Sequence, residues 1–142
     1  MAEEPDLQWD MVVGLKEALD RLRRIVIPSD DQQGKKLGAH FGRAPYLVLV
    51  EIDDSKGEVK TSVHENRSSH LGGHGFTHDN VMQMRPDAVI VSGIGPRGLE
   101  LFRRAGISVL QARSTSIEEI ISAYMSGSLN AVTEGCHEAH HR

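Results

Sequence analysis

Short apolar stretches alternate with helix-like segments along this chain, and their order constrains the fold more than any other feature. The turn residues Asp53-Asp-Ser-Lys-Gly57 predict that the second and third apolar stretches form a β-hairpin. Helices are expected between the later strands. Strands are predicted at 24–29, 46–52, 58–64, 87–92 and 107–111, and helices from 77 or 79 to 85 and from 99 to 105. A last helix, capped by Thr115 or Ser116, is predicted to end near residue 127.

A hairpin followed by strand–helix–strand units predicts an α/β domain over residues 24–128. Crossovers in such units are right-handed and place their helices against the faces of the sheet. We therefore expect a five-stranded mixed sheet with helices on both faces. The polar residues that follow, 129–142, are expected to form a flexible tail rich in His and Cys.

The segment before the first strand has the spacing of an amphipathic helix. Between residues 5 and 23, apolar side chains such as Leu15, Leu19 and Leu22 recur at steps of three and four. We expect an N-terminal helical extension over residues 1–23. It can pack on its own domain or on a neighbouring subunit, as in a homodimer, or be a disordered leader.

Composition and charge exclude several classes of protein. The 142 residues are 39% hydrophobic, which is enough for a real core, and the net charge is −4 with scattered Lys and Arg. That charge pattern argues against a nucleic-acid binder. The apolar runs are too short to span a bilayer, and the acidic start lacks a signal-peptide pattern. With Cys136 as its single cysteine, the chain is expected to be a cytoplasmic protein.

Histidine is concentrated in a few segments, and imidazole and thiolate are ligands for soft and borderline metals. Three histidines share a glycine-rich stretch at helical spacing, although its glycines make a continuous helix there unfavourable. This pattern favours a loosely held metal centre over a closed structural site. The competing interpretation is a set of solvated loop and tail histidines. The metal-ligand candidates are His40, His70, His74, His78, Cys136, His137 and His140.

The string Gly93-Ile-Gly-Pro-Arg-Gly98 follows a predicted buried strand and precedes a predicted helix. Free amides at a helix start attract anions, and Arg97 adds a bidentate donor. The string lacks the Lys and Ser/Thr of a phosphate-binding P-loop and the full spacing of a dinucleotide motif. A tight turn that needs glycine for packing is the alternative.

Four sequence motifs, in their order along the chain, resemble those of a known family. They are Ile25-Val-Ile-Pro-Ser-Asp30, His40-Phe-Gly-Arg-Ala-Pro-Tyr46, Gly73-His-Gly75 and Gly93-Ile-Gly-Pro-Arg97. The chain is similar, over roughly residues 24–128, to the dinitrogenase iron–molybdenum cofactor biosynthesis family of NifX/NifB C-terminal type. The resemblance implies a ribonuclease-H-like three-layer α/β domain. It also implies a carrier or accessory protein for iron–molybdenum cofactor or its iron–sulfur precursors.

The resemblance also ranks the site residues. His40 matches the family's His-Phe-Gly histidine and His74 its Gly-His-Gly histidine, so these two are the first candidates for holding a cluster. A cluster is anionic, and Arg43, Gly95 and Arg97 are expected to supply the surrounding donors. We expect these loops to meet at one edge of the sheet.

The expected function is non-catalytic: binding an iron–sulfur or iron–molybdenum-type cluster and passing it between metallocluster donor and acceptor proteins. Two alternatives stay open, a small-anion or nucleotide-binding regulatory module that uses Gly93 to Gly98, and a metal-dependent hydrolase that uses the histidines. A nuclease is excluded, because the first strand, Ile25-Val-Ile-Pro28, lacks the carboxylates that hold Mg²⁺ in such enzymes.

Overall fold

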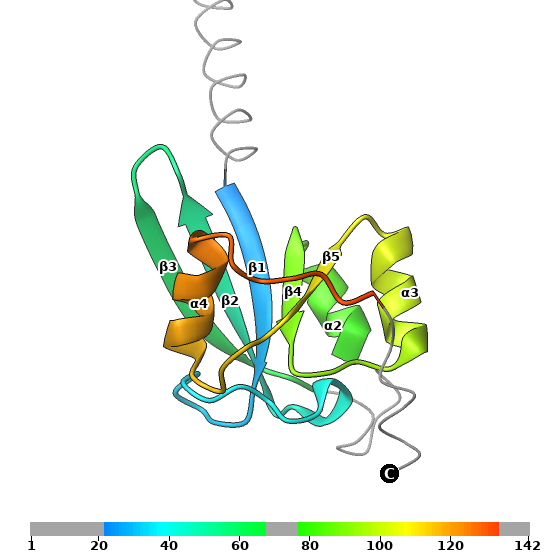
Figure 1. Cartoon of the computed structure of the whole chain (residues 1–142). Coiled ribbons are helices and arrows are strands. Elements are labelled where there is room, and N and C mark those ends of the chain that lie inside the picture. Colours follow the sequence, from blue (N-terminus) through cyan, green and yellow to red (C-terminus); the bar gives the residue numbers. More distant parts are fainter. Residues whose placement is uncertain (1–21, 68–76, 134–142) are drawn as a thin grey trace, which may run out of the picture.

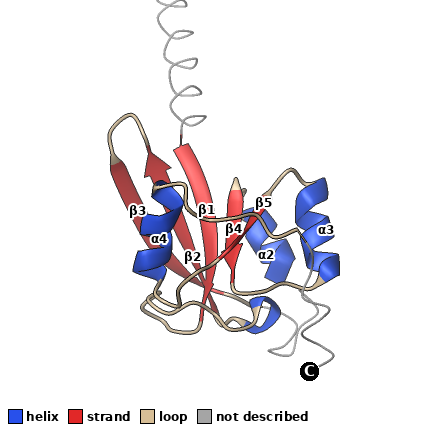
Figure 2. Ribbon diagram, in the orientation of Figure 1, coloured by secondary structure: helices blue, strands red, loops and turns tan. Residues whose placement is uncertain are grey.

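The computed structural model describes residues 22–67 and 77–133, which form one five-stranded sheet with helices on both of its faces (Figures 1 and 2). The three helices and the short 3₁₀ turn η1 lie between or after the strands. In chain order the elements are β1 (Leu22–Ser29), η1 (Phe41–Arg43), β2 (Tyr46–Asp53), β3 (Glu58–Glu65), α2 (Thr77–Gln83), β4 (Ala88–Val91), α3 (Pro96–Arg104), β5 (Ser108–Gln111) and α4 (Ile117–Met125).

The strands lie in the order β3-β2-β1-β4-β5, with β1 at the centre. β1 pairs antiparallel with β2 and parallel with β4, β2 pairs antiparallel with β3, and β4 pairs parallel with β5. The hairpin and the crossovers that were predicted from the sequence therefore produce the mixed sheet that was predicted.

Each face of the sheet is buried under its own helices, as the alternation of side chains along a strand requires. On β1, Ile25 and Ile27 belong to a core cluster with Ile117 and Ile120 of α4. Val26 lies on the other face, in a cluster with residues of α2 and α3. Helices thus cover both faces, which confirms the expected layering of the α/β domain.

Several predicted bounds need correction. β1 begins at Leu22, so residues 22 and 23, which were predicted to end the N-terminal helix, belong to the sheet. The remainder of the N-terminal extension lies outside the described residues. α3 begins at Pro96 rather than at residue 99, because proline at the first helical position needs no hydrogen-bond partner for its nitrogen. The last helix begins after the predicted cap Ser116, whose hydroxyl accepts from the Glu119 amide.

The expectation of a flexible tail from residue 129 is wrong for its first part. The Gln111 amide donates to the Asn130 carbonyl, and the Val132 amide donates to the Val109 carbonyl, both at 2.8 Å. Arg103 of α3 also donates to the carbonyls of residues 132 and 133. Residues 130–132 therefore pair with β5 and cover that edge of the sheet.

Candidate functional site

The loop after β1 begins with a tight turn around one carboxylate. Asp31 Oδ1 accepts hydrogen bonds from the amides of Lys35 (3.0 Å) and Lys36 (2.8 Å) and from the Ser29 hydroxyl (2.8 Å). The backbone hydrogen bond from Lys36, joined by those of Ser29 and Lys35, holds the pKa of Asp31 below the usual value for an aspartate. The carboxylate is thus ionised at neutral pH and fixes the course of the chain toward His40.

The same loop is tied to the end of β4. Ser92 Oγ lies 3.1 Å from the Gly38 carbonyl and 3.0 Å from the Ala39 carbonyl, and it donates to them. Ser92 directly precedes the Gly93–Gly98 string, and Ala39 directly precedes His40. The two motifs that were expected to meet at one edge of the sheet are therefore neighbours, joined by this hydroxyl.

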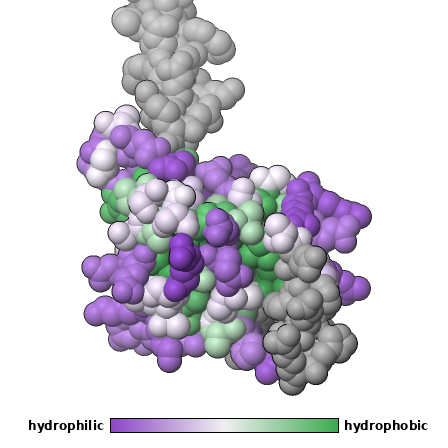
Figure 3. Space-filling view, viewed as in Figure 1, coloured by the Kyte–Doolittle hydropathy of each residue, from purple (hydrophilic) through white to green (hydrophobic). Residues whose placement is uncertain are grey.

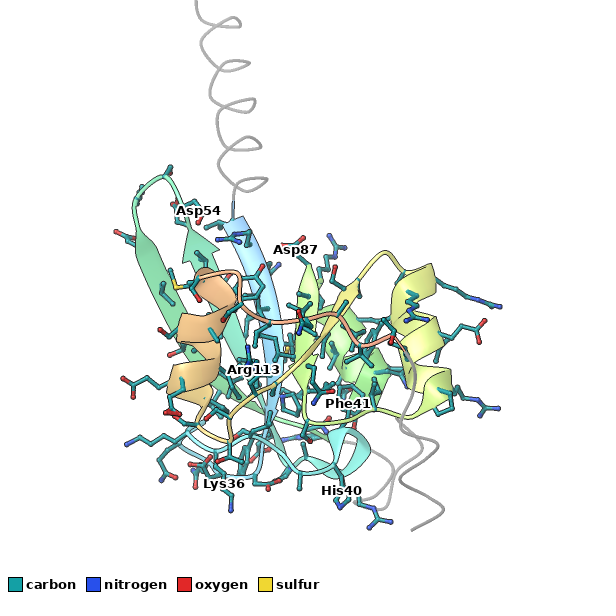
Figure 4. All side chains as sticks on the ribbon, in the orientation of Figure 1. Lys36, His40, Phe41, Asp54, Asp87 and Arg113 are labelled. Carbon is teal, nitrogen blue, oxygen red and sulfur yellow. The ribbon has the colours of Figure 1, made fainter. Side chains whose placement is uncertain are left out.

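His40 is exposed, while the residue that follows it is anchored. Phe41 is buried and packs edge-on against Phe102 of α3, with ring centroids 5.6 Å apart and an interplanar angle of 87°. His40 precedes η1 with extended backbone and its ring makes no capping bond, and Arg43 at the end of η1 is also exposed. Figure 4 shows His40 at the outer margin of the domain and Phe41 turned inward. The loop is thus fixed by its phenylalanine and presents its histidine to solvent.

Three polar side chains bind the two flanks of residues 68–76 to the η1 loop. Asn66 is 1% exposed, and its amide group donates to the Ala44 carbonyl (2.7 Å) and to Thr77 Oγ1 (2.9 Å). Thr77 Oγ1 donates in turn to the Gly42 carbonyl at 3.0 Å. Asn80 of α2 donates to Asn66 Oδ1 at 2.7 Å. Asn66 and Thr77, which lie on either side of residues 68–76, are therefore both next to the loop that carries His40.

The Gly93–Gly98 string forms the turn into α3 as predicted. Gly95 is the N-cap, and a Cβ placed on it would meet nothing within 4 Å, so packing does not require glycine there. The first amides of a helix have no partner within the helix and remain available to an anion. A depression of about 540 Å³ lies beside this turn, lined by His78, Arg97, Gly98, Glu100, Leu101 and Arg104.

The structure thus brings together the segments of four predicted site residues, His40, Arg43, Gly95 and Arg97. His78 of α2, another predicted candidate, lines the same depression as Arg97. Their roles as ligands stay predictions. Within residues 22–67 and 77–133, no group of three or more His, Cys, Asp or Glu side chains is placed to hold a metal ion. The remaining candidates, His70, His74, Cys136, His137 and His140, lie outside the described residues.

The residues that hold these loops together were not predicted from the sequence. Ser92, Asn66 and Thr77 are polar residues next to motifs, but their partners are distant in the chain, up to 54 residues for Ser92 and Gly38. The sequence offered one signal for Asn66, which is its position directly after a strand. An asparagine that is buried there needs partners for its hydrogen bonds. Nothing in the local pattern indicates which carbonyls it contacts.

Comparisons with known proteins agree with this architecture. The family model described as dinitrogenase iron–molybdenum cofactor matches residues 23–127. An uncharacterized protein of Methanocaldococcus jannaschii is 32% identical over 110 residues, which cover 77% of this chain and 91% of the relative.

Two solved structures share the fold. One, a candidate dinitrogenase of M. jannaschii, is 23% identical with a TM-score of 0.64, over 78% of this chain and 95% of that one. The other, the apo form of the orange protein from Desulfovibrio gigas, is 18% identical with a TM-score of 0.62, over 80% of this chain and 95% of that one. At this identity the two structures establish the fold alone. Together with the family match and the relative at 32% identity, the sequence and the fold show that the chain belongs to the dinitrogenase iron–molybdenum cofactor family.

Proposed function

We propose that this protein is a non-catalytic carrier or accessory protein that binds an iron–sulfur or iron–molybdenum-type cluster for cofactor assembly or transfer. Its partners are then a cluster donor and a cluster acceptor protein. Family membership supports the class of cargo. The observation that carries the proposal is the meeting of the family's motif segments at one edge of the sheet, through Ser92 and the Asn66–Thr77 pair.

The chemistry of this edge suits an anionic, bulky cargo. His40 offers an exposed imidazole from an anchored loop, and Arg43 and Arg97 offer cationic donors from the same loop and from the start of α3. Such donors form strong hydrogen bonds to an anion. A carrier must also release its cargo, so a site with few protein ligands that opens to solvent is preferable to a closed four-ligand site.

One alternative has an observation in its favour. The depression lined by Arg97 and Arg104 beside the start of α3 suits a small anion or a nucleotide phosphate, as in a regulatory module. Glu100 lines the same depression and opposes an anion there. No comparable observation favours the metal-dependent hydrolase.

Anaerobic reconstitution with iron and sulfide, with and without molybdate, tests the proposal. We expect a visible absorption band and bound iron that survive desalting, and no tight binding of nucleotide by calorimetry. A protein that stays colourless and binds nucleotide tightly would instead be the regulatory module.

A truncated protein tests whether the C-terminal tail binds the cluster, and the fold decides where the chain should be cut. Truncation after Leu129 would remove residues 130–132, which pair with β5. Truncation after Thr133 removes Cys136, His137 and His140 and leaves that pairing intact. We expect this variant to load more cluster than His40→Ala does.

A further inference from the structure

The strand β3 forms an open edge of the sheet. All eight of its residues are exposed, and it pairs with β2 through eight successive partners, from Glu58–Asp53 to Glu65–Tyr46. The opposite edge, β5, is covered by residues 130–132. In Figure 1 no described element lies beyond β3. Proteins usually protect such an edge with charged side chains, proline, a bulge or a very short strand. β3 carries Glu58, Lys60 and Glu65, but it has no proline or bulge and is eight residues long.

Two valines are exposed on this flank among polar side chains. Among the described residues, the large hydrophobic side chains classed as exposed are Val59 (39%), Val63 (37%) and Met125 (47%). Val59 and Val63 are register partners of Ile52 and Val48, so they lie on the face of the sheet that α4 covers, and Met125 belongs to α4. The surface in Figure 3 is otherwise dominated by hydrophilic residues, with hydrophobic ones showing between them.

We propose that β3 pairs antiparallel with β3 of a second copy of this chain, about a two-fold axis at Thr61. In this register Val59 of each copy lies opposite Val63 of the other, and Glu58 lies opposite His64. Directly opposed apolar pairs stabilise antiparallel strands, and a carboxylate can accept a hydrogen bond from an opposed imidazole. The sequence Glu58-Val-Lys-Thr-Ser-Val-His64 is therefore complementary to itself in this arrangement.

Neighbouring registers that keep the same faces together fit less well. An axis at Lys60 places the two Lys60 ammonium groups opposite each other, and like charges in that position are destabilising. An axis at Ser62 places Val59 opposite Glu65 and Lys60 opposite His64. Of these three axes, only the one at Thr61 pairs valine with valine and carboxylate with imidazole.

A hydrogen bond with Ser62 can set which ring nitrogen of His64 carries the proton. Its Nε2 lies 2.8 Å from Ser62 Oγ. When the hydroxyl donates to Nε2, the proton of the neutral ring is on Nδ1, which can then donate to the Glu58 carboxylate of the second copy. Glu58 begins β3 and is exposed, so its carboxylate is accessible.

The pairing joins the two five-stranded sheets into one continuous sheet. Because the strands run in opposite directions, the loop after β1 of each copy lies at the opposite end of the pair, and both candidate sites stay open. This dimer is independent of the proposed cargo, and its tests require no cluster.

Cysteine cross-linking tests the register directly. Opposed Cα atoms in an antiparallel pair lie about 4.5–5.5 Å apart, within reach of a disulfide, whereas diagonal positions at about 7–8 Å lie at or beyond that reach. In the full-length Cys136→Ser background, mild oxidation should cross-link Thr61→Cys. Lys60→Cys, Ser62→Cys and the hairpin-turn control Lys56→Cys should remain at the background level. Preferential cross-linking of Lys60→Cys or Ser62→Cys would overturn the register, and no cross-linking above the Lys56→Cys control would overturn the dimer.

Charge exchange tests the Glu58–His64 pair in solution. Glu58→Lys and His64→Glu should each raise the dimer dissociation constant about tenfold, because each change affects two symmetry-related pairs. The double variant Glu58→Lys/His64→Glu again places attracting groups, now of opposite charge, across from each other and should return the constant to near that of the parent. Sedimentation equilibrium measures all four proteins. Single variants that dimerise like the parent, or a double variant as weak as the single ones, would contradict the pairing.

Discussion

The loop after β1 and the turn after β4 leave neighbouring parallel strands at the same edge of the sheet, yet they are held in different ways. The long loop, residues 30–45, is fixed by side chains: Asp31 at its start, Phe41 in the core and Asn66 at its end. The short turn, residues 92–95, is held by the buried Ile94 and by the Ser92 hydroxyl, which donates to the long loop, and it leaves Gly95 open. The long loop can therefore position a ligand side chain, and the short turn can offer backbone amides.

Removing the aromatic anchor of the long loop should have the largest effect. Phe41→Ala deletes a buried ring and its edge-on contact with Phe102. The free energy of unfolding should fall by about 3–5 kcal/mol, measured by urea denaturation. Phe41→Leu is the matched control and should cost much less. A Phe41→Ala protein as stable as the parent would show that the loop is not anchored through this ring.

The buried asparagine should come next. Asn66→Ala removes the donors to the Ala44 carbonyl and to Thr77, and it leaves those buried oxygens with fewer partners. The free energy of unfolding should fall by about 1–3 kcal/mol. Asn80→Ala, which removes a partly exposed partner of the same network, should cost less. If both variants lost the same free energy of unfolding, burial would not determine how much each asparagine contributes to stability.

Glycine substitutions compare the two connections directly. Gly34 has a φ of +67°, and a Cβ there would lie 2.7 Å from Val63 Cγ2 and 2.9 Å from Val48 Cγ2. Gly34→Ala should therefore destabilise the domain by at least about 1 kcal/mol. Gly95→Ala has an ordinary φ of −67° and open space, so it should change stability by about 0.5 kcal/mol or less. Thermal unfolding of both variants measures the difference, and a reversed order would contradict the contrast.

The smallest expected effect is a dependence on acid. The folded pKa of Asp31 lies below its ordinary value of 3.8, so the stabilisation is fully present above that value and is lost as the pH falls through the folded pKa. The protection of the Lys35 and Lys36 amides from hydrogen exchange, measured by NMR and corrected for the intrinsic exchange rate, should fall in this acid range. Asp31→Asn should lose part of this pH dependence. Protection that is the same at pH 2 and pH 6 would remove the role of the carboxylate.

The strands could be predicted because their apolar residues are local and periodic. The hairpin, the parallel crossovers and the cap at Ser116 also follow from short patterns. The η1 turn and the pairing of residues 130–132 with β5 could not be predicted in this way, because each depends on tertiary contacts with distant segments. The site was predicted as a set of motifs, but the polar contacts of Ser92, Asn66 and Thr77 that assemble it have no periodic signature.

The most direct test of the central claim is cluster loading of His40→Ala after anaerobic reconstitution, measured as iron per protein and as visible absorption. His64→Ala is the matched control, since it removes an exposed histidine that lies on β3 and outside the candidate site. We expect the control to load like the parent and His40→Ala to retain cluster at least about tenfold more weakly. Full loading of His40→Ala, together with none in the protein truncated after Thr133, would place the site in the C-terminal tail and contradict this account.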